Sequence, residues 1–251
     1  MKMDRVIAVR NHKTVFRDGN RCIKMFDETY TKADVLSEAL SHARVEETGL
    51  NVPEILELVK LDGKWAIVSR FVQGRTLARL LREQPDRTDE FMNLFVNLQL
   101  QVHSKTCPLL TRQKEKLDMQ ILKCDLDATT RYDLHSRLDS MNRQYYLCHG
   151  DFAPDNIILQ PDGTPCIVDW AHATQGSPAA DAAQTHLQFL LDGQEDLAQK
   201  YLSLYCETCA IAPAALEKWL PIMAAARSVK GHAGEKALLL SLARSAALKL
   251  V

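Results

Sequence analysis

The chain has 251 residues, of which 46% are hydrophobic and 25% charged, and its formal net charge is −1. This composition excludes a disordered chain and a fibrous repeat, and leaves room for one large domain or two lobes. The balanced charge provides no global basic field of the kind that attracts nucleic acid or an anionic membrane.

The first quarter of the chain alternates between apolar and polar residues as strands do. The runs VIAVRN, KTVFRD and NRCIKMF are short and β-prone, and an Asp-Gly pair at 18–19 predicts a hairpin turn between the last two. Apolar residues then recur at helical spacing over 32–47. A second Asp-Gly pair at 62–63 joins ILELVKL to KWAIVSRFV. These patterns predict a small, mostly antiparallel sheet with one helix.

The pattern changes after Gly74, and apart from a strand-rich stretch at 145–169 the remainder is predicted to be helical. Further helices are expected at about 178–191, 194–208, 213–228 and 234–249. We therefore predict two domains, a lobe at 1–73 and a lobe at 74–251, with a hinge near 72–75.

Neither end of the chain predicts secretion or a membrane anchor. The first residues lack an apolar signal segment, and the seven cysteines are scattered, which favours the reducing cytoplasm. The apolar C-terminal run is too short to span a bilayer and is interrupted by Arg244 and Lys249. We expect a buried C-terminal helix, a cytoplasmic location and no membrane partner.

The stretch from 145 to 181 carries the residues best suited to chemistry. A short strand leads into a loop containing Asp151, Asn156 enters the next strand, and the partner strand of that hairpin ends on Asp169. Two carboxylates and an amide carbonyl are therefore expected at one end of a hairpin. Hard oxygen ligands of this kind suit Mg²⁺. Phosphoryl transfer needs such a metal, a base for the incoming hydroxyl and positive charge on the phosphates.

The motifs HGDFAPDN, IVDW and GSPAAD in this stretch resemble the signature of the aminoglycoside phosphotransferase and choline kinase-like family. The resemblance implies an α+β, bilobal protein-kinase-like fold, with a small antiparallel sheet lobe carrying one helix and a larger, mainly helical lobe. It also implies a kinase that moves the γ-phosphate of ATP, or of GTP, to a hydroxyl of a small molecule. Asp151 would then be the base, and Asn156 and Asp169 the Mg²⁺ ligands.

The first lobe agrees with this family in the order of its elements. The resemblance implies that the strand residue Lys24 contacts the α- and β-phosphates and that the helix residue Glu38 orients it. It assigns Ser69 and Phe71, in the hinge IVSRFVQGRTL, to the nucleotide. A solvated strand lysine is the alternative for Lys24. Three other glutamates are alternatives to Glu38, namely Glu28, Glu46 and Glu47.

Several positions depart from the family pattern or favour a structural role. The loop RNHKT has no glycine to clamp phosphates, Asp155 stands where relatives often carry glycine, and Arg70 stands where they often carry glutamate. His149 is more typical of a hydrogen-bonded structural histidine than of a catalyst. Asp181 is expected to bond the catalytic loop from the start of a helix.

The sequence leaves open which molecule accepts the phosphate and whether the protein catalyses the transfer at all. Only eight residues, 170–177, separate the metal aspartate from the next helix, which disfavours a protein substrate. A polycationic aminoglycoside would favour an acidic cleft, but seven acidic and seven basic residues follow position 177. A choline-like acceptor would need an aromatic cage, for which Tyr201, Tyr205 and Trp219 are available. A nucleotide-binding regulatory protein without turnover is the main alternative, and a helical interaction module is a weaker one.

Overall fold

The computed structural model describes residues 5–10, 12–229 and 233–245, and the chain divides into two compact units. Unit 1 comprises Met1–Thr88 and Pro154–Ala173, and unit 2 comprises Asp89–Ala153 and Thr174–Val251. This division by compactness places the segment 154–173 with the N-terminal sheet. The lobes 1–73 and 74–251, with their expected functions of nucleotide binding and catalysis, were predicted from the sequence pattern and not by compactness. That division therefore stays a prediction.

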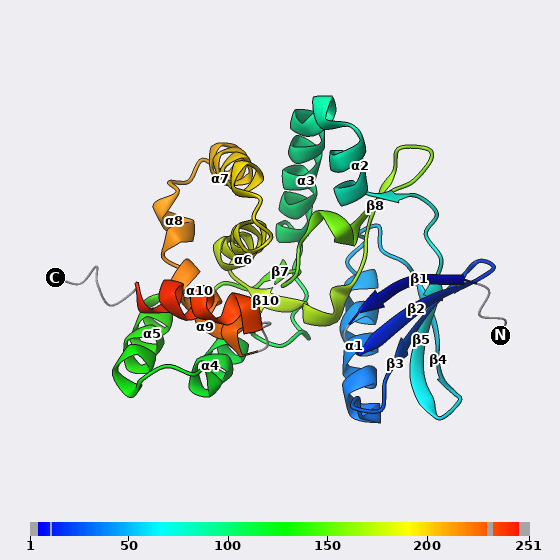
Figure 1. Ribbon diagram of the computed structural model, residues 1–251, viewed down its shortest axis with the longest axis horizontal. Coiled ribbons are helices and arrows are strands. Elements are labelled where there is room, and N and C mark those ends of the chain that lie inside the picture. The colour runs from blue at the N-terminus through cyan, green and yellow to red at the C-terminus, as the bar shows by residue number, and fades with distance from the viewer. Residues whose placement is uncertain (1–4, 11, 230–232, 246–251) are drawn as a thin grey trace. The chain divides into compact units, whose positions relative to one another are not determined.

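Unit 1 is built around a five-stranded sheet in which every neighbouring pair of strands is antiparallel (Figure 1). The strand order is β1-β2-β3-β5-β4. The predicted opening of three strands, a helix and two strands is therefore confirmed. The strands are β1 (Arg5–Arg10), β2 (Lys13–Asp18), β3 (Arg21–Phe26), β4 (Ile55–Leu61) and β5 (Lys64–Arg70).

The helix α1 (Lys32–Glu46) packs on one face of this sheet, through Val35 against Phe26 and Ile67. Its start is held by a capping box between Thr31 and Asp34. The Asp34 amide donates to the Thr31 hydroxyl at 3.2 Å, and the Thr31 amide donates to the Asp34 carboxylate at 2.9 Å. Because the cap satisfies donors that a helix start leaves unpaired, it fixes where α1 begins.

Replacing Thr31 by alanine is expected to lower the free energy of unfolding by about 1 kcal/mol, since the cap loses its side-chain acceptor. Urea unfolding followed by circular dichroism measures this loss. The matched control is Ser41→Ala on the same helix, where the hydroxyl donates to the already helical carbonyl of Ser37 at 3.0 Å. Equal losses in the two variants would contradict a special role for the cap.

The remaining parts of unit 1 form a three-stranded sheet of order β6-β8-β9. In it Arg75 pairs with Leu159, which ties the segment after β5 to the later hairpin. Gly74 permits this approach, because a Cβ there would lie 2.4 Å from the Leu159 carbonyl oxygen. The elements are β6 (Arg75–Thr76), α2 (Leu77–Glu83), the 3₁₀ turns η1 (Pro85–Arg87), η2 (Pro154–Asn156) and η3 (Trp170–His172), β8 (Ile157–Leu159) and β9 (Pro165–Ile167).

Unit 2 is mainly helical, with one short antiparallel strand pair, β7 (Tyr146–Cys148) with β10 (Thr174–Gly176) (Figure 1). Rings of Phe95, Phe152, Phe189 and Tyr201 lie at its core, with centroids of neighbouring rings 4.7 to 5.9 Å apart. The helices are α3 (Thr88–His103), α4 (Gln113–Lys123), α5 (Ala128–Ser140), α6 (Pro178–Leu191), α7 (Glu195–Cys209), α8 (Ala214–Glu217), α9 (Leu220–Ser228) and α10 (Ala233–Arg244).

Two predicted elements differ from those observed. The single helix expected at 213–228 is interrupted between α8 and α9, because Pro221 in the first turn of α9 lacks the N–H that a continuous helix requires. The strand expected to reach Asp169 ends at Ile167. Of the helix expected at about 234–249, residues 246–249 lie outside the described residues.

Among the described residues no single helix is long and apolar enough to cross a membrane. One helix pair, Glu195–Cys209 with Ala214–Ser228, meets the criteria of length and composition only when both helices are taken together, and it is bent by 110°.

Candidate active site

Lys24 in unit 1 lies between two carboxylates. Its ammonium nitrogen is 2.6 Å from Glu38 Oε1 and 2.8 Å from Asp169 Oδ1, and all three side chains are largely buried. Burial alone would lower the pKa of Lys24, but the negative charges of Asp169 and Glu38 outweigh it and raise this pKa above 10.5. Lys24 therefore carries a positive charge at neutral pH. The glutamate beside Lys24 is Glu38, whereas the roles of both residues in nucleotide binding stay a prediction.

Asp169 reaches Lys24 from a strained turn. The Val168 amide still donates to the Asn156 carbonyl at 2.9 Å, but Asp169 then adopts a left-handed conformation with φ 66°. A non-glycine residue pays on the order of 1–2 kcal/mol for this conformation. The buried Trp170 closes the turn, since its ring nitrogen donates to the Ile167 carbonyl at 3.0 Å. The strand ends early because this turn redirects the chain.

Asn156 lies at the same end of the β8–β9 hairpin as Asp169. It immediately precedes Ile157, which pairs with Ile167, and it is 3% exposed. An amide oxygen and a carboxylate are a donor set that fits Mg²⁺, which takes one or two protein ligands and completes its shell with phosphates and water. No group of three or more His, Cys, Asp or Glu side chains that could hold a metal ion occurs among the residues described.

A pocket of about 400 Å³ opens within unit 1 around this cluster. Its volume lies in the range typical of small-molecule and cofactor sites. Six of the seven predicted site residues line it: Lys24, Glu38, Ser69, Phe71, Asn156 and Asp169. The seventh, Asp151, belongs to unit 2.

The hinge strand uses some of its backbone groups within the sheet. The Phe71 amide donates to the Asn20 carbonyl at 3.0 Å, so its N–H is already used within the protein. The Arg17 guanidinium lies 4.2 Å from the centroid of the Phe71 ring. Arg70 forms an exposed ion pair with Glu54 at 2.8 Å. The arginine at position 70 therefore has a partner at the surface.

Lys13 and His42 also line this pocket, and sequence reasoning assigned neither of them to the site. Burial lowers the pKa of His42, and its Nε2 lies 2.7 Å from the Pro53 carbonyl oxygen. Lys13 is the first residue of β2, and its ammonium lies 2.8 Å from Glu38 Oε2. The sequence signals for Lys13 were its place in the loop RNHKT and the strand-like alternation of the run KTVFRD.

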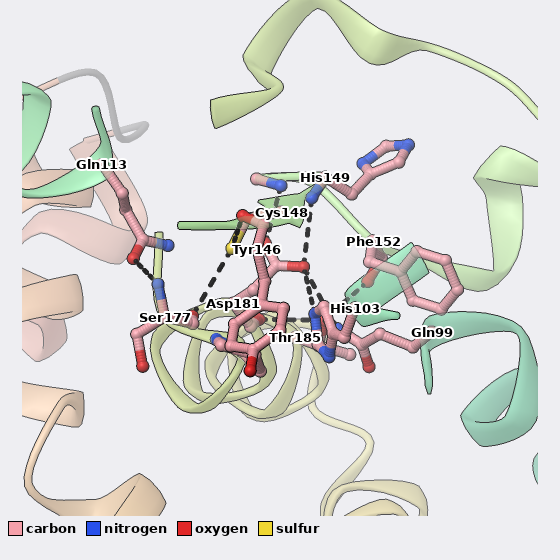
Figure 2. Close-up of polar contacts among 12 residues, drawn as sticks. Gln99, His103, Gln113, Tyr146, Cys148, His149, Phe152, Ser177, Asp181 and Thr185 are labelled. Atoms are coloured by element: carbon pink, nitrogen blue, oxygen red, sulfur yellow. Dashed lines mark hydrogen bonds and ion pairs between the residues drawn. The ribbon is translucent and has the colours of Figure 1, made fainter. Parts of the chain in front are cut away.

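In unit 2 the loop that carries Asp151 is anchored by Asp181, near the start of α6 (Figure 2). The Asp181 carboxylate accepts the backbone amides of His149 at 3.1 Å and of Gly150 at 2.7 Å. Gly150 has φ 76°, a left-handed conformation that glycine adopts without steric cost. The prediction that Asp181 bonds this loop from the start of a helix is confirmed, whereas the catalytic role of Asp151 stays a prediction.

His149 is also structural. It is fully buried, and its Nδ1 accepts the Asp151 amide at 3.2 Å, which places the ring proton on Nε2 when the ring is neutral. Phe152 packs edge-on against the His149 ring at 5.7 Å, and its carbonyl accepts the Thr185 hydroxyl at 3.0 Å. The backbone around Asp151 is thus held at several successive residues.

The Asp181 side chain is 1% exposed, and it contacts the His103 ring as well as the two loop amides. Its Oδ2 lies 3.0 Å from Nε2 of His103, whose Nδ1 lies 3.0 Å from the Tyr205 hydroxyl. Burial alone would raise the pKa of Asp181, but the hydrogen bond and charge of His103 and the hydrogen bond from the Gly150 amide lower it below 3.8.

The aromatic residues considered for a choline cage do not form one. Tyr201 and Tyr205 are buried, and the Tyr201 hydroxyl donates to Gln99 Oε1 at 2.6 Å. Trp219 instead lines a second pocket, of about 390 Å³, within unit 2. Three acidic and three basic residues share that lining: Glu115, Asp118, Asp139, Arg112, Lys114 and Arg143. A net acidic lining, which would suit a polycation, is not present there.

The comparisons with known proteins agree with this architecture. A model of the phosphotransferase enzyme family matches residues 8–219. No curated protein matches the sequence. The fold is similar to that of a thermostable mutant of aminoglycoside phosphotransferase APH(4)-Ia, solved with ADP and hygromycin B (12% identity, 96% of this chain and 92% of that chain, TM-score 0.70).

Two further solved structures share the fold at similarly low identity. One is APH(3'')-Id from Streptomyces rimosus, in complex with ADP and streptomycin (18% identity, 85% of this chain and 90% of that chain, TM-score 0.61). The other is the choline kinase LicA from Streptococcus pneumoniae (13% identity, 96% of this chain and 90% of that chain, TM-score 0.62). The predicted α+β, kinase-like fold class is confirmed.

Proposed function

The chain belongs to the phosphotransferase enzyme family, and from that premise we propose that it transfers the γ-phosphate of ATP to a hydroxyl of a small molecule. The observation that carries the proposal is the pocket of unit 1, in which the charged Lys24 and two oxygen-bearing side chains, Asn156 and Asp169, lie together. The nucleotide complexes of its structural relatives support ATP, with GTP as a second possibility.

Each proposed residue has a role that follows from its chemistry. Lys24 binds phosphate oxygens through its ammonium, and Glu38 orients that ammonium. Asp151 accepts the proton of the acceptor hydroxyl on a carboxylate oxygen. Asn156 and Asp169 would hold Mg²⁺, which when bound neutralises negative charge on the phosphates. Ser69 and Phe71 line the space for the base and sugar of the nucleotide.

The acceptor is proposed to be a small molecule with a free hydroxyl. A polycation is less well supported, because the described pocket of unit 2 has a balanced lining. A quaternary amine is less well supported too, because Tyr201 and Tyr205 are core residues.

The proposal is tested by incubating the protein with Mg-ATP and a panel of aminoglycosides, choline, ethanolamine, thiamine, sugars and nucleosides. The expected result is phosphate transfer to one class of acceptor, detected by mass spectrometry of the product. Asp151→Asn protein prepared in the same way reports any contaminating kinase. Mg-ATP binding without transfer to any acceptor would favour the regulatory alternative, and no nucleotide binding would refute the proposal.

A further inference from the structure

The hairpin that would cover the nucleotide phosphates is unusual in its sequence. Residues 5–18, which include β1 and β2, contain no glycine. Glycine in phosphate-binding loops allows backbone amides to approach phosphate oxygens closely. A hairpin without glycine is less suited to this approach, and a side-chain cation is another way to supply positive potential.

Lys13 lies where its ammonium could supply this positive potential. In the β2–β3 register Val15 pairs with Lys24 and Lys13 pairs with Phe26, so both lysines lie on the same face of the sheet, as diagonal neighbours. Lys13 lines the same pocket as Lys24, and only 18% of its side chain is exposed. A lysine with no function at this position would more commonly extend into solvent.

The ammonium of Lys13 is held in position by three neighbours. It lies 2.8 Å from Glu38 Oε2 and within 5.1 and 5.3 Å of the ring centroids of Phe26 and Tyr30. The other oxygen of Glu38 contacts Lys24 at 2.6 Å. One carboxylate therefore orients two ammonium groups within one pocket. Asp169 also contacts Lys24, so the two carboxylates balance the two lysines, and what Lys13 offers an anion is a local ammonium contact rather than a net positive charge.

We propose that Lys13 is a second phosphate-binding residue, which provides through its side-chain charge the contact that the glycine-free hairpin does not provide through backbone amides. This inference rests on the proposed nucleotide-dependent function. It assigns Glu38 a wider role as well, since Glu38 positions both phosphate-binding lysines. An ammonium binds phosphate as a point charge, so the contact does not require the close backbone approach of a glycine loop.

The test compares nucleotides that differ in their number of phosphates, by isothermal titration calorimetry with Mg²⁺ present. Lys13→Met is expected to weaken binding of ATP and ADP by about tenfold to a hundredfold, as for the loss of a charged hydrogen bond, and to leave adenosine affinity unchanged. Lys13→Arg, which keeps the charge, should recover most of the ATP affinity. Lys60→Met, on the exposed side of β4, is the matched control and should bind all ligands as the wild type does.

Other results would overturn the inference. ATP affinity equal to that of the wild type in Lys13→Met would exclude a phosphate contact. Equal weakening of ATP and adenosine would show that Lys13 only supports the pocket wall. If Lys13→Met fails to fold, Lys13→Arg and Lys13→Gln decide, because only loss of charge should reduce ATP affinity. A wild-type protein that binds no nucleotide would instead refute the proposed function, and with it this inference.

Discussion

Replacing Asp151 by asparagine is expected to lower kcat by about 10²- to 10⁴-fold, the usual contribution of a general base. The amide has nearly the same shape as the carboxylate but cannot accept the proton of the acceptor hydroxyl. Nucleotide affinity should be retained, because the residues proposed to bind the nucleotide lie in unit 1. Phosphate transfer to the identified acceptor and calorimetric titration with ATP measure the two quantities.

The loop around Asp151 should survive this substitution. In its backbone contacts the Asp151 amide donates to the His149 ring and the Gly150 amide donates to Asp181, and neither uses the Asp151 side chain. Asp86→Asn in an exposed turn is the control for removing one carboxylate and should have wild-type kcat. An Asp151→Asn protein with kcat close to that of the wild type would exclude Asp151 as the base. Loss of ATP binding would point to a role in nucleotide binding instead.

Replacing Asp181 by alanine is expected to lower the free energy of unfolding by about 3–5 kcal/mol, the usual cost of removing one partner of a buried ion pair. The amides of His149 and Gly150 and the ring of His103 would lose their shared acceptor in the core (Figure 2). Asp181→Asn keeps one carbonyl acceptor and should cost less, about 1–3 kcal/mol. Urea unfolding measures the free energy of unfolding of the wild type, Asp181→Ala and Asp181→Asn.

The stability lost in Asp181→Ala should also depend on pH, and should become smaller as the pH falls. The pKa of Asp181 lies below 3.8 in the folded protein, so its stabilising contribution is present above that pH and is lost as the pH falls through the folded-state value. The difference between the wild type and Asp181→Ala should therefore shrink in strong acid. Asp196→Ala, an exposed carboxylate on α7, should change stability by less than about 0.5 kcal/mol. An equal loss in Asp196→Ala would contradict the argument from burial.

Local sequence was sufficient for the N-terminal sheet and for the anchored loop that carries Asp151. Asp-Gly pairs mark hairpin turns, and strand alternation has a short period, so the opening strands and α1 could be predicted from nearby residues alone. The motif HGDFAPDN predicted the anchored loop, and the Asp181 contacts confirmed it. The same local reasoning failed at 213–228, where an apolar helical pattern concealed the break at Pro221.

Tertiary structure decided which side chains meet. Four glutamates could have paired with Lys24, and the rotation of α1, set by Val35 packing on the sheet, placed Glu38 there. Sheet register brought Lys13 to the same carboxylate, and the turn at Asp169 directed its side chain to Lys24. Contacts of this kind join residues 14 to 145 positions apart, and their geometry depends on packing between elements. A local pattern carries no information about that packing. The sequence by itself therefore determined the elements and motifs, and the tertiary structure determined which of their side chains contact each other.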